Sequence, residues 1–238
     1  MKQKFWNGLV KAVRLTRPFF FEFIIIMMGI MLSLWLNDIR QDSEKHKDER
    51  ATLLQVLEDL KADSSKVSNN LTDIKEYMEQ SMKLIQIKDD SIKAAFPGIY
   101  NEVREVVTYV PFEPSKVGYI ELTTQGKSGK VADKQLVMDI MGLHEEGYRN
   151  ITRLTDAHRD FLINKIYDYI TKQMPYFGTK NDITEERKTA FVNALHADEF
   201  RHMLFFDIVL KQNLEEAYIQ TYKVQKILIE EIEKQLNK

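Results

Sequence analysis

The sequence predicts an all-α protein with a single N-terminal transmembrane helix, followed by an elongated antiparallel bundle of three long helices with a short helical insertion. Three observations support this prediction. Nine Gly and five Pro in 238 residues are too few turn formers for a many-stranded β-sandwich or barrel. One run near the N-terminus is apolar enough to cross a bilayer, and the remaining chain shows long stretches of helical periodicity.

Composition and charge exclude several functional classes. The chain has no Cys, which removes disulfide frameworks, thiolate nucleophiles and iron–sulfur clusters. The net charge is −2, but residues 1–17 carry five basic side chains and no acid, so the rest of the chain sums to −7. A nucleic-acid-binding domain would need a basic face on its folded body, so we expect no nucleic-acid partner. A basic N-terminal end indicates a membrane surface instead.

Residues 18–37 form the predicted transmembrane helix. Residues 18–36 contain fifteen apolar side chains, and Glu22 is their only charge. At about 1.5 Å per residue this run reaches roughly 28 Å, close to the thickness of the hydrocarbon core. A cleaved signal peptide is the alternative, but the run is long and ends in Trp35 and Leu36 rather than in small residues. The basic flank precedes the span, which predicts a cytoplasmic N-terminus and an extracytoplasmic remainder.

The basic segment 1–17 has helical spacing of apolar side chains, so it can lie in the headgroup layer before the chain turns inward at Pro18. A frayed basic tail is the equally open alternative. The predicted anchors at the membrane interface are Trp6, Arg14, Arg17 and Trp35.

One face of the predicted span carries all its polar and small side chains. Spacings of four, three, four and three residues place on this face Glu22, Ile26, Gly29, Ser33 and Leu36. Gly29 and Ser33 form a small-xxx-small pair, which allows close helix approach in lipid. Self-association through this face is the first interpretation. A Glu22 that is only interfacial and a proton- or ion-conducting role for Glu22 are the other two.

Residues 38–238 are predicted to form the helical bundle. The long helices are expected at about 40–93, 133–174 and 184–236, with Thr184 as an N-cap and an insertion at 97–132. Within the insertion, 103–110 fits a short strand or a helix end. The first long segment shows a heptad stripe made of Leu53, Leu57, Leu60, Val67, Leu71, Ile74, Met78 and Ile85. Packing within the chain or between chains must cover such a stripe.

The sequence offers no convincing catalytic, cofactor-binding or metal-binding residues, so we predict a protein that is not an enzyme and needs no cofactor. Gly126-Lys127-Ser128 lacks the upstream glycine of a phosphate-binding loop. A mononuclear metal site from His196, Glu199 and His202 is the only metal alternative. A solvated helix face explains the same residues.

Two patches resemble an uncharacterised family of single-pass, membrane-anchored helical proteins of Gram-negative bacteria, a domain of unknown function. The first patch has Glu22 at the start of the span, the Gly29-Ile30 step and the exit from Trp35 to Ile39, followed by a charged run into Leu53, Leu54, Leu57, Asp59 and Leu60. The second comprises Tyr119, Glu121, Leu122, Gly126, Leu136 and Ile140. The resemblance covers residues 17–75 and 112–145. It implies an inner-membrane anchor with a periplasmic helical domain, and it brings no activity with it.

Three functional classes follow. The first is a non-enzymatic membrane-anchored scaffold or protein-interaction module, oligomeric through the transmembrane face. The second is a subunit of an ion-driven or channel-like assembly that uses Glu22, and the third is a periplasmic ligand sensor acting through a partner. The partners expected are the lipid bilayer and either further copies of this chain or another membrane protein.

Overall fold

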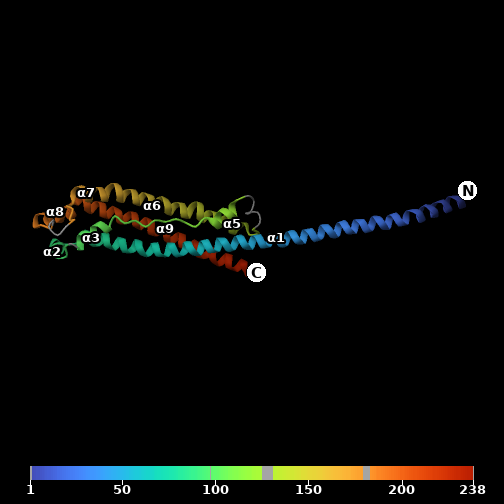
Figure 1. Ribbon diagram of the computed structural model, residues 1–238, viewed down its shortest axis with the longest axis horizontal. Helices are drawn as coiled ribbons and strands as arrows, with labels where there is room; N and C mark the ends of the chain where they lie inside the picture. Colours follow the sequence, from blue (N-terminus) through green and yellow to red (C-terminus); the bar gives the residue numbers. More distant parts are fainter. Residues whose placement is uncertain (1, 97, 125–130, 179–182, 238) are drawn as a thin grey trace. The chain divides into compact units, whose positions relative to one another are not determined.

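The computed structural model describes residues 2–96, 98–124, 131–178 and 183–237, with side chains from residue 22 onward except at 93 and 94 (Figure 1). The structure is 86% helical, and these ranges contain no strand. The all-α class predicted from the sequence is therefore confirmed. The chain forms two compact units, Met1–Ala51 and Thr52–Lys238.

Helix α1 spans Lys2–Gln86, so it begins in the first unit and ends in the second. The segments 1–17 and 18–37, which the sequence treats separately, are both helical, and the helix continues through Pro18. It ends at Gln86, earlier than the predicted 93, because Lys88 adopts extended backbone angles. This break lets the next helix turn across the end of the bundle and bury Ile92.

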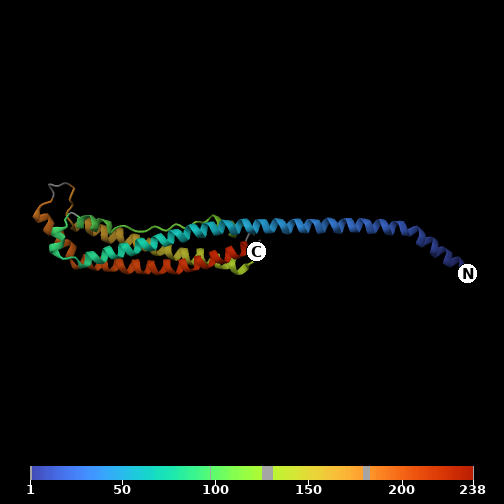
Figure 2. The ribbon, with the colours of Figure 1, turned by 90° about the horizontal axis from the view of Figure 1, so that it is seen from below.

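Three short helices follow: α2 (Asp89–Ala94), α3 (Gly98–Glu105) and α4 (Val117–Thr123). Between α3 and α4 the chain runs beside the second part of α1 without helix, as both views show (Figures 1 and 2). Val110 and Phe112 from this stretch are buried in the core. The segment 103–110 is thus a helix end followed by this extended connection.

The second long helical stretch consists of consecutive segments: α5 (Lys134–Gly142), the π-helical η2 (Leu143–Tyr148), α6 (Arg149–Phe161), the π-helical η3 (Leu162–Tyr167) and α7 (Asp168–Gln173). Asp133 caps its N-terminus, with the carboxylate 3.0 Å from the amide of Leu136.

The third stretch is two helices, α8 (Glu185–His196) and α9 (Asp198–Leu236). The predicted N-cap at Thr184 is confirmed, since its hydroxyl accepts from the amide of Arg187. The stretch is not one helix, because Ala197 takes an extended ψ of 135° and separates α8 from α9. Phe191 and Phe200 on the two sides of this break are both fully buried in the same core.

Helix α9 runs antiparallel to the second part of α1. Ion pairs join Lys61 to Glu233 at 2.6 Å and Lys75 to Glu215 at 3.6 Å, so the numbering rises in one helix as it falls in the other. These exposed pairs report the register and stabilise it only weakly. The side chains between the helices form two hydrophobic cores, one lined by the heptad stripe and one under α2, α3 and α8. From residue 52 onward the predicted stripe is therefore covered within the chain.

Candidate functional site

The first unit contains a helical surface that is apolar and uncovered. Among the described residues, one helix is long and apolar enough to cross a membrane, and its apolar window buries none of its surface within the chain. The large side chains concerned are between 39 and 64% exposed, namely Phe23, Ile25, Ile26, Met27, Met28, Ile30, Met31, Leu32, Leu34, Trp35, Leu36 and Ile39. Exposing side chains of this size to water is unfavourable, and full burial of each one lowers the free energy by about 1.5–3 kcal/mol.

The predicted self-association face lies on this surface. Glu22, Ile26, Gly29, Ser33 and Leu36 are all exposed. A Cβ added at Gly29 would meet nothing within 4 Å, so the space beside it is open. Of the four predicted interface anchors, Trp35 is 59% exposed. The side chains of Trp6, Arg14 and Arg17 lie outside the described residues.

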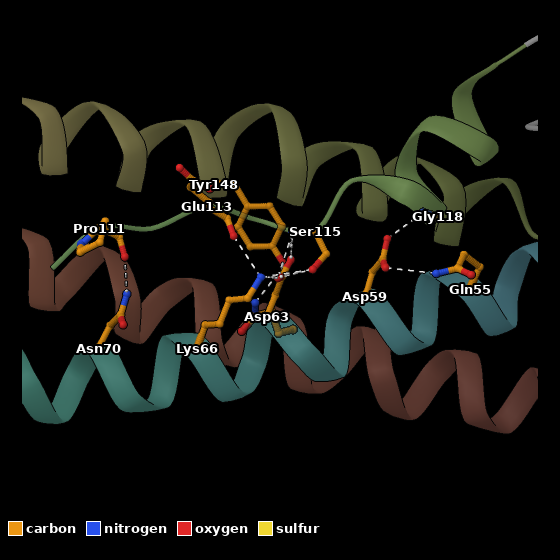
Figure 3. A network of polar contacts seen from close by, with 11 residues as sticks. Gln55, Asp59, Asp63, Lys66, Asn70, Pro111, Glu113, Ser115, Gly118 and Tyr148 are labelled. Atoms are coloured by element: carbon orange, nitrogen blue, oxygen red, sulfur yellow. Dashed lines mark hydrogen bonds and ion pairs between the residues drawn. The ribbon is translucent and has the colours of Figure 1, made fainter.

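A network of carboxylate contacts in the second unit holds the extended connection against α1 (Figure 3). The Asp63 carboxylate accepts from the Ser115 amide at 2.9 and 3.0 Å and from the Ser115 hydroxyl at 2.9 Å. Lys66 bridges the Asp63 carboxylate, at 3.0 Å, and the Glu113 carbonyl, at 3.1 Å. One turn earlier, Asp59 accepts from the amide of Gly118 at 2.7 Å.

This network satisfies backbone amides and carbonyls of the extended connection, which would otherwise be paired within a helix or sheet. Asn70 extends it, because its amide nitrogen donates to the carbonyl of Pro111 at 3.3 Å and to the hydroxyl of Tyr218 at 2.9 Å. Lys116 precedes α4 and gives it no side-chain cap, so the Asp59 carboxylate caps the helix from α1. Polar side chains spaced along α1 thus fix the path of the connection.

His144 lies beside this network in an aromatic stack. Its ring is parallel to Tyr119, with 4.2 Å between the centroids, and meets Tyr148 edge-on at 4.7 Å. Burial lowers the pKa of His144 to about 4, although the nearby carboxylates of Asp63 and Asp59 act in the opposite direction. His144 is therefore neutral at pH 7. Burial disfavours the charged form of tyrosine as well, so it raises the pKa of Tyr148 and raises the pKa of Tyr218 to about 12.

A second network, which we call the buried charge network, joins α1, α6 and α9 through Ser81, His158, Asp207 and Lys211. All four residues are at most 2% exposed. One oxygen of Asp207 lies 2.8 Å from His158 Nε2, and the other accepts from Lys211 Nζ at 2.7 Å and from the Ser81 hydroxyl at 2.8 Å. Lys211 also donates to Ser81 Oγ at 3.2 Å.

These contacts explain the charge state of Asp207. Burial alone would raise the pKa of its carboxyl, but the hydrogen bond from His158 and the charge of Lys211 outweigh burial and hold the pKa below its ordinary value. For Lys211, burial lowers the pKa of the ammonium, and the adjacent carboxylate opposes it. Three acceptors surround Nζ, on Asp207, Ser81 and the Tyr77 carbonyl, which matches the three N–H groups of an ammonium. We therefore assign an ion pair.

The arrangement of the buried charge network suits structural pairing rather than catalysis. Ser81 and His158 both contact Asp207, so the histidine is not placed as a base for the serine hydroxyl. The near-complete burial of the four residues also keeps substrates away. His158 Nδ1 is buried and has no hydrogen-bond partner.

The metal alternative from the sequence does not assemble. Among the residues that the structure describes, no three His, Asp or Glu side chains are grouped to hold a metal ion. Both ring nitrogens of His196 contact the chain, Nε2 at 3.1 Å from the Ile87 carbonyl and Nδ1 at 2.6 Å from Asp89. Glu199 and His202 line a shallow surface beside Phe206.

Sequence analysis missed both polar networks, although α9 carries a signal for one of them. Phe200, Leu204, Asp207, Lys211 and Leu214 follow spacings of four, three, four and three, so an acid and a base occupy adjacent core positions. Opposite charges four residues apart on a buried face indicate a buried pair. The partners Ser81 and His158 lie far away in sequence, and no local pattern connects them.

Comparison with known proteins adds no assignment, because no protein-family model, curated protein or solved structure matches this chain. The resemblance over residues 17–75 and 112–145 therefore stays a prediction.

Proposed function

We propose that this chain is a non-enzymatic, membrane-anchored helical scaffold. In this proposal residues 18–37 cross a bacterial inner membrane once, the N-terminus is cytoplasmic, and the remaining chain is a periplasmic bundle of three long helical stretches. The observation that carries it is the run of exposed apolar side chains between Phe23 and Ile39. A dozen such side chains would cost on the order of 20 kcal/mol in water, whereas hydrocarbon removes this cost.

The bundle supports a structural role. The side chains of the buried charge network bind one another, and the carboxylates of Asp59 and Asp63 bind backbone amides. Groups used in this way fix the packing of helices and connections. The charge distribution supports the orientation, because the basic residues precede the span.

Lysine substitutions in the span test the anchor. With Ile25→Lys and Met28→Lys together, we expect the full chain to leave the pellet of alkaline-carbonate-washed membranes, since each lysine costs about 2.5–3.5 kcal/mol in the centre of a span. The matched control is Val117→Lys with Ile120→Lys, two exposed apolar residues of α4, and it should stay in the pellet with the wild type. Protease added to spheroplasts should digest the bundle. A wild-type chain found in the carbonate supernatant, or a protected bundle, would contradict the proposal.

Self-association through the face of Gly29 is the second part of the proposal. Gly29→Leu should weaken the dimer or higher oligomer about fivefold, near 1 kcal/mol, because the larger side chain keeps the helix backbones apart. Light scattering of the full chain across a dilution series in neutral detergent measures this change. Met31→Leu lies on the opposite face and is the control. A strict monomer in the wild type, or equal effects of the two variants, would remove the oligomer from the proposal.

A further inference from the structure

A groove of about 740 Å³ lies between α9 and the stretch formed by α5, η2 and the start of α6. One wall uses residues of α9 from Asn213 to Glu231, all on one helical face. The other wall uses residues from Met138 to Asn150. At about 1.5 Å per residue these walls are roughly 27 Å and 18 Å long. The groove therefore follows the helix axes and is long enough for three to five helical turns.

Small residues line the bottom of the groove and leave space for the side chains of a partner. Gly142, Gly147, Ala217 and Thr221 face it from the two walls. A Cβ added at Gly147 would lie 3.3 Å from Leu143 Cδ1 and 3.6 Å from Thr221 Oγ1, so the walls are close there. A Cβ at Gly142 would meet nothing within 4 Å. The space above Gly142 is thus open to an incoming side chain.

Large apolar side chains stand exposed along the same groove. Met138 is 57%, Val224 41% and Ile227 56% exposed. The two cores of the bundle are complete without them. Methionine adapts its shape to different partners, which suits a docking surface.

The rim of the groove is acidic. Asp139 and Glu146 lie on one wall and Glu216 and Glu231 on the other, and among the described residues that line the groove there is no Lys, Arg or His. A partner that places basic side chains over this rim and apolar side chains in the floor is complementary in charge and chemistry. A symmetric contact with a second copy is not complementary, because it would bring the four acids of each groove together.

We infer that this groove binds an amphipathic helix of a partner protein whose apolar stripe, at spacings of three and four residues, is flanked by Lys or Arg. Such a helix would pack between α9 and the α5–α6 stretch as one more helix of the bundle, with its large side chains over the glycines and its cations against the rim. This inference rests on the proposed scaffold function in one respect, since it names the class of partner that the scaffold holds.

Binding of a synthetic helix to the full chain in zwitterionic nanodiscs tests the inference, with empty nanodiscs as the blank. The probe is a labelled peptide of about 18 residues with a leucine stripe flanked by lysines, and the matched peptide has glutamates in place of the lysines. We expect the lysine peptide to bind at least about tenfold more tightly than the glutamate peptide, and its affinity to fall as salt rises.

Gly142→Trp should fill the open space and weaken binding of the lysine peptide at least about tenfold. Gly98→Trp is the matched control, because a Cβ at Gly98 also meets nothing within 4 Å but lies outside the groove, and it should bind as the wild type does. Equal binding by both variants, or equal affinity for the two peptides, would overturn the inference. A mass that halves in Gly142→Trp without any peptide binding would assign the groove to a second copy and overturn it as well.

A cross-linking measurement covers the case in which Gly142→Trp fails to fold. Because the chain has no Cys, Gln220→Cys places a single photo-cross-linker in the groove, and Lys226→Cys places one on the opposite, exposed face of α9. Only the first should capture the lysine peptide, and capture by neither or by both would contradict the groove. A chain that fails this test but stays in the carbonate pellet would leave the membrane anchor intact, so the two failures are distinguishable.

Discussion

Replacing Asp207 by asparagine is expected to lower the free energy of unfolding by about 3–5 kcal/mol. The substitution keeps the volume of the side chain but removes its charge. Lys211 is 1% exposed and would then lose its counterion in the interior, where keeping the charge or giving up the proton both cost free energy, while His158 and Ser81 would lose a charged acceptor. Urea denaturation of the full chain in neutral detergent, followed by circular dichroism, measures the loss.

Removing the other charge should cost less. In Lys211→Met the Asp207 carboxylate still receives hydrogen bonds from His158 and Ser81, and His158 is one of the two residues that lower its pKa. We therefore expect a loss of about 1–3 kcal/mol for Lys211→Met alone. The double variant Asp207→Asn with Lys211→Met should be more stable than Asp207→Asn, because it leaves no unpaired buried charge.

The unfolding free energies of the two single variants and the double variant together decide whether the network contains an ion pair. Additive effects would mean that Asp207 and Lys211 do not interact as charges, contrary to the 2.7 Å contact between them. A double variant equal to the sum of the single losses is thus the result that contradicts our assignment. Lys75→Met, which breaks an exposed pair with Glu215, should change stability by less than about 1 kcal/mol and serves as the comparison.

The helical class of this protein could be predicted because it depends on local patterns. The scarcity of turn formers and the apolar stripe at spacings of three and four can both be read from short stretches of sequence. The structure confirms the stripe, because it buries Leu53, Leu57, Leu60, Val67 and Ile74. The cap at Thr184 is equally local. The ends of helices were harder to predict from the sequence. Helix α1 ends at Gln86 so that α2 can cover a core, and segments far away in the sequence complete that core.

The polar networks and the groove could not be predicted in the same way. Asp63 contacts Ser115, which is 52 residues away, and Ser81 contacts Asp207 across 126 residues. A single sequence contains no periodicity that links such positions. The groove depends on which faces of α5 and α9 meet, and glycines inside a helical pattern, such as Gly142 and Gly147, do not by themselves indicate a groove.

Replacing Gly118 by alanine is expected to destabilise the protein by about 3 kcal/mol. Gly118 lies in the first turn of α4, where its added Cβ would stand 2.7 Å from both the Cα and the amide nitrogen of Val56. Both atoms belong to the backbone of α1, so no side-chain rotation relieves the overlap, and α4 must move away. That movement also lengthens the 2.7 Å hydrogen bond from the Gly118 amide to Asp59. Urea denaturation measures the loss, and faster tryptic cleavage after Lys116 should accompany it.

Helix propensity alone predicts the opposite sign, which makes the experiment decisive. Alanine is favoured over glycine inside helices by about 0.8–1 kcal/mol. Gly142 provides the matched control, since it lies in a continuous helical stretch and its added Cβ meets nothing within 4 Å. Gly142→Ala should therefore stabilise the chain by up to about 1 kcal/mol while Gly118→Ala destabilises it. If both substitutions stabilised the protein, the close approach of α4 to α1, and with it the anchoring of the extended connection by Asp59 and Asp63, would be wrong.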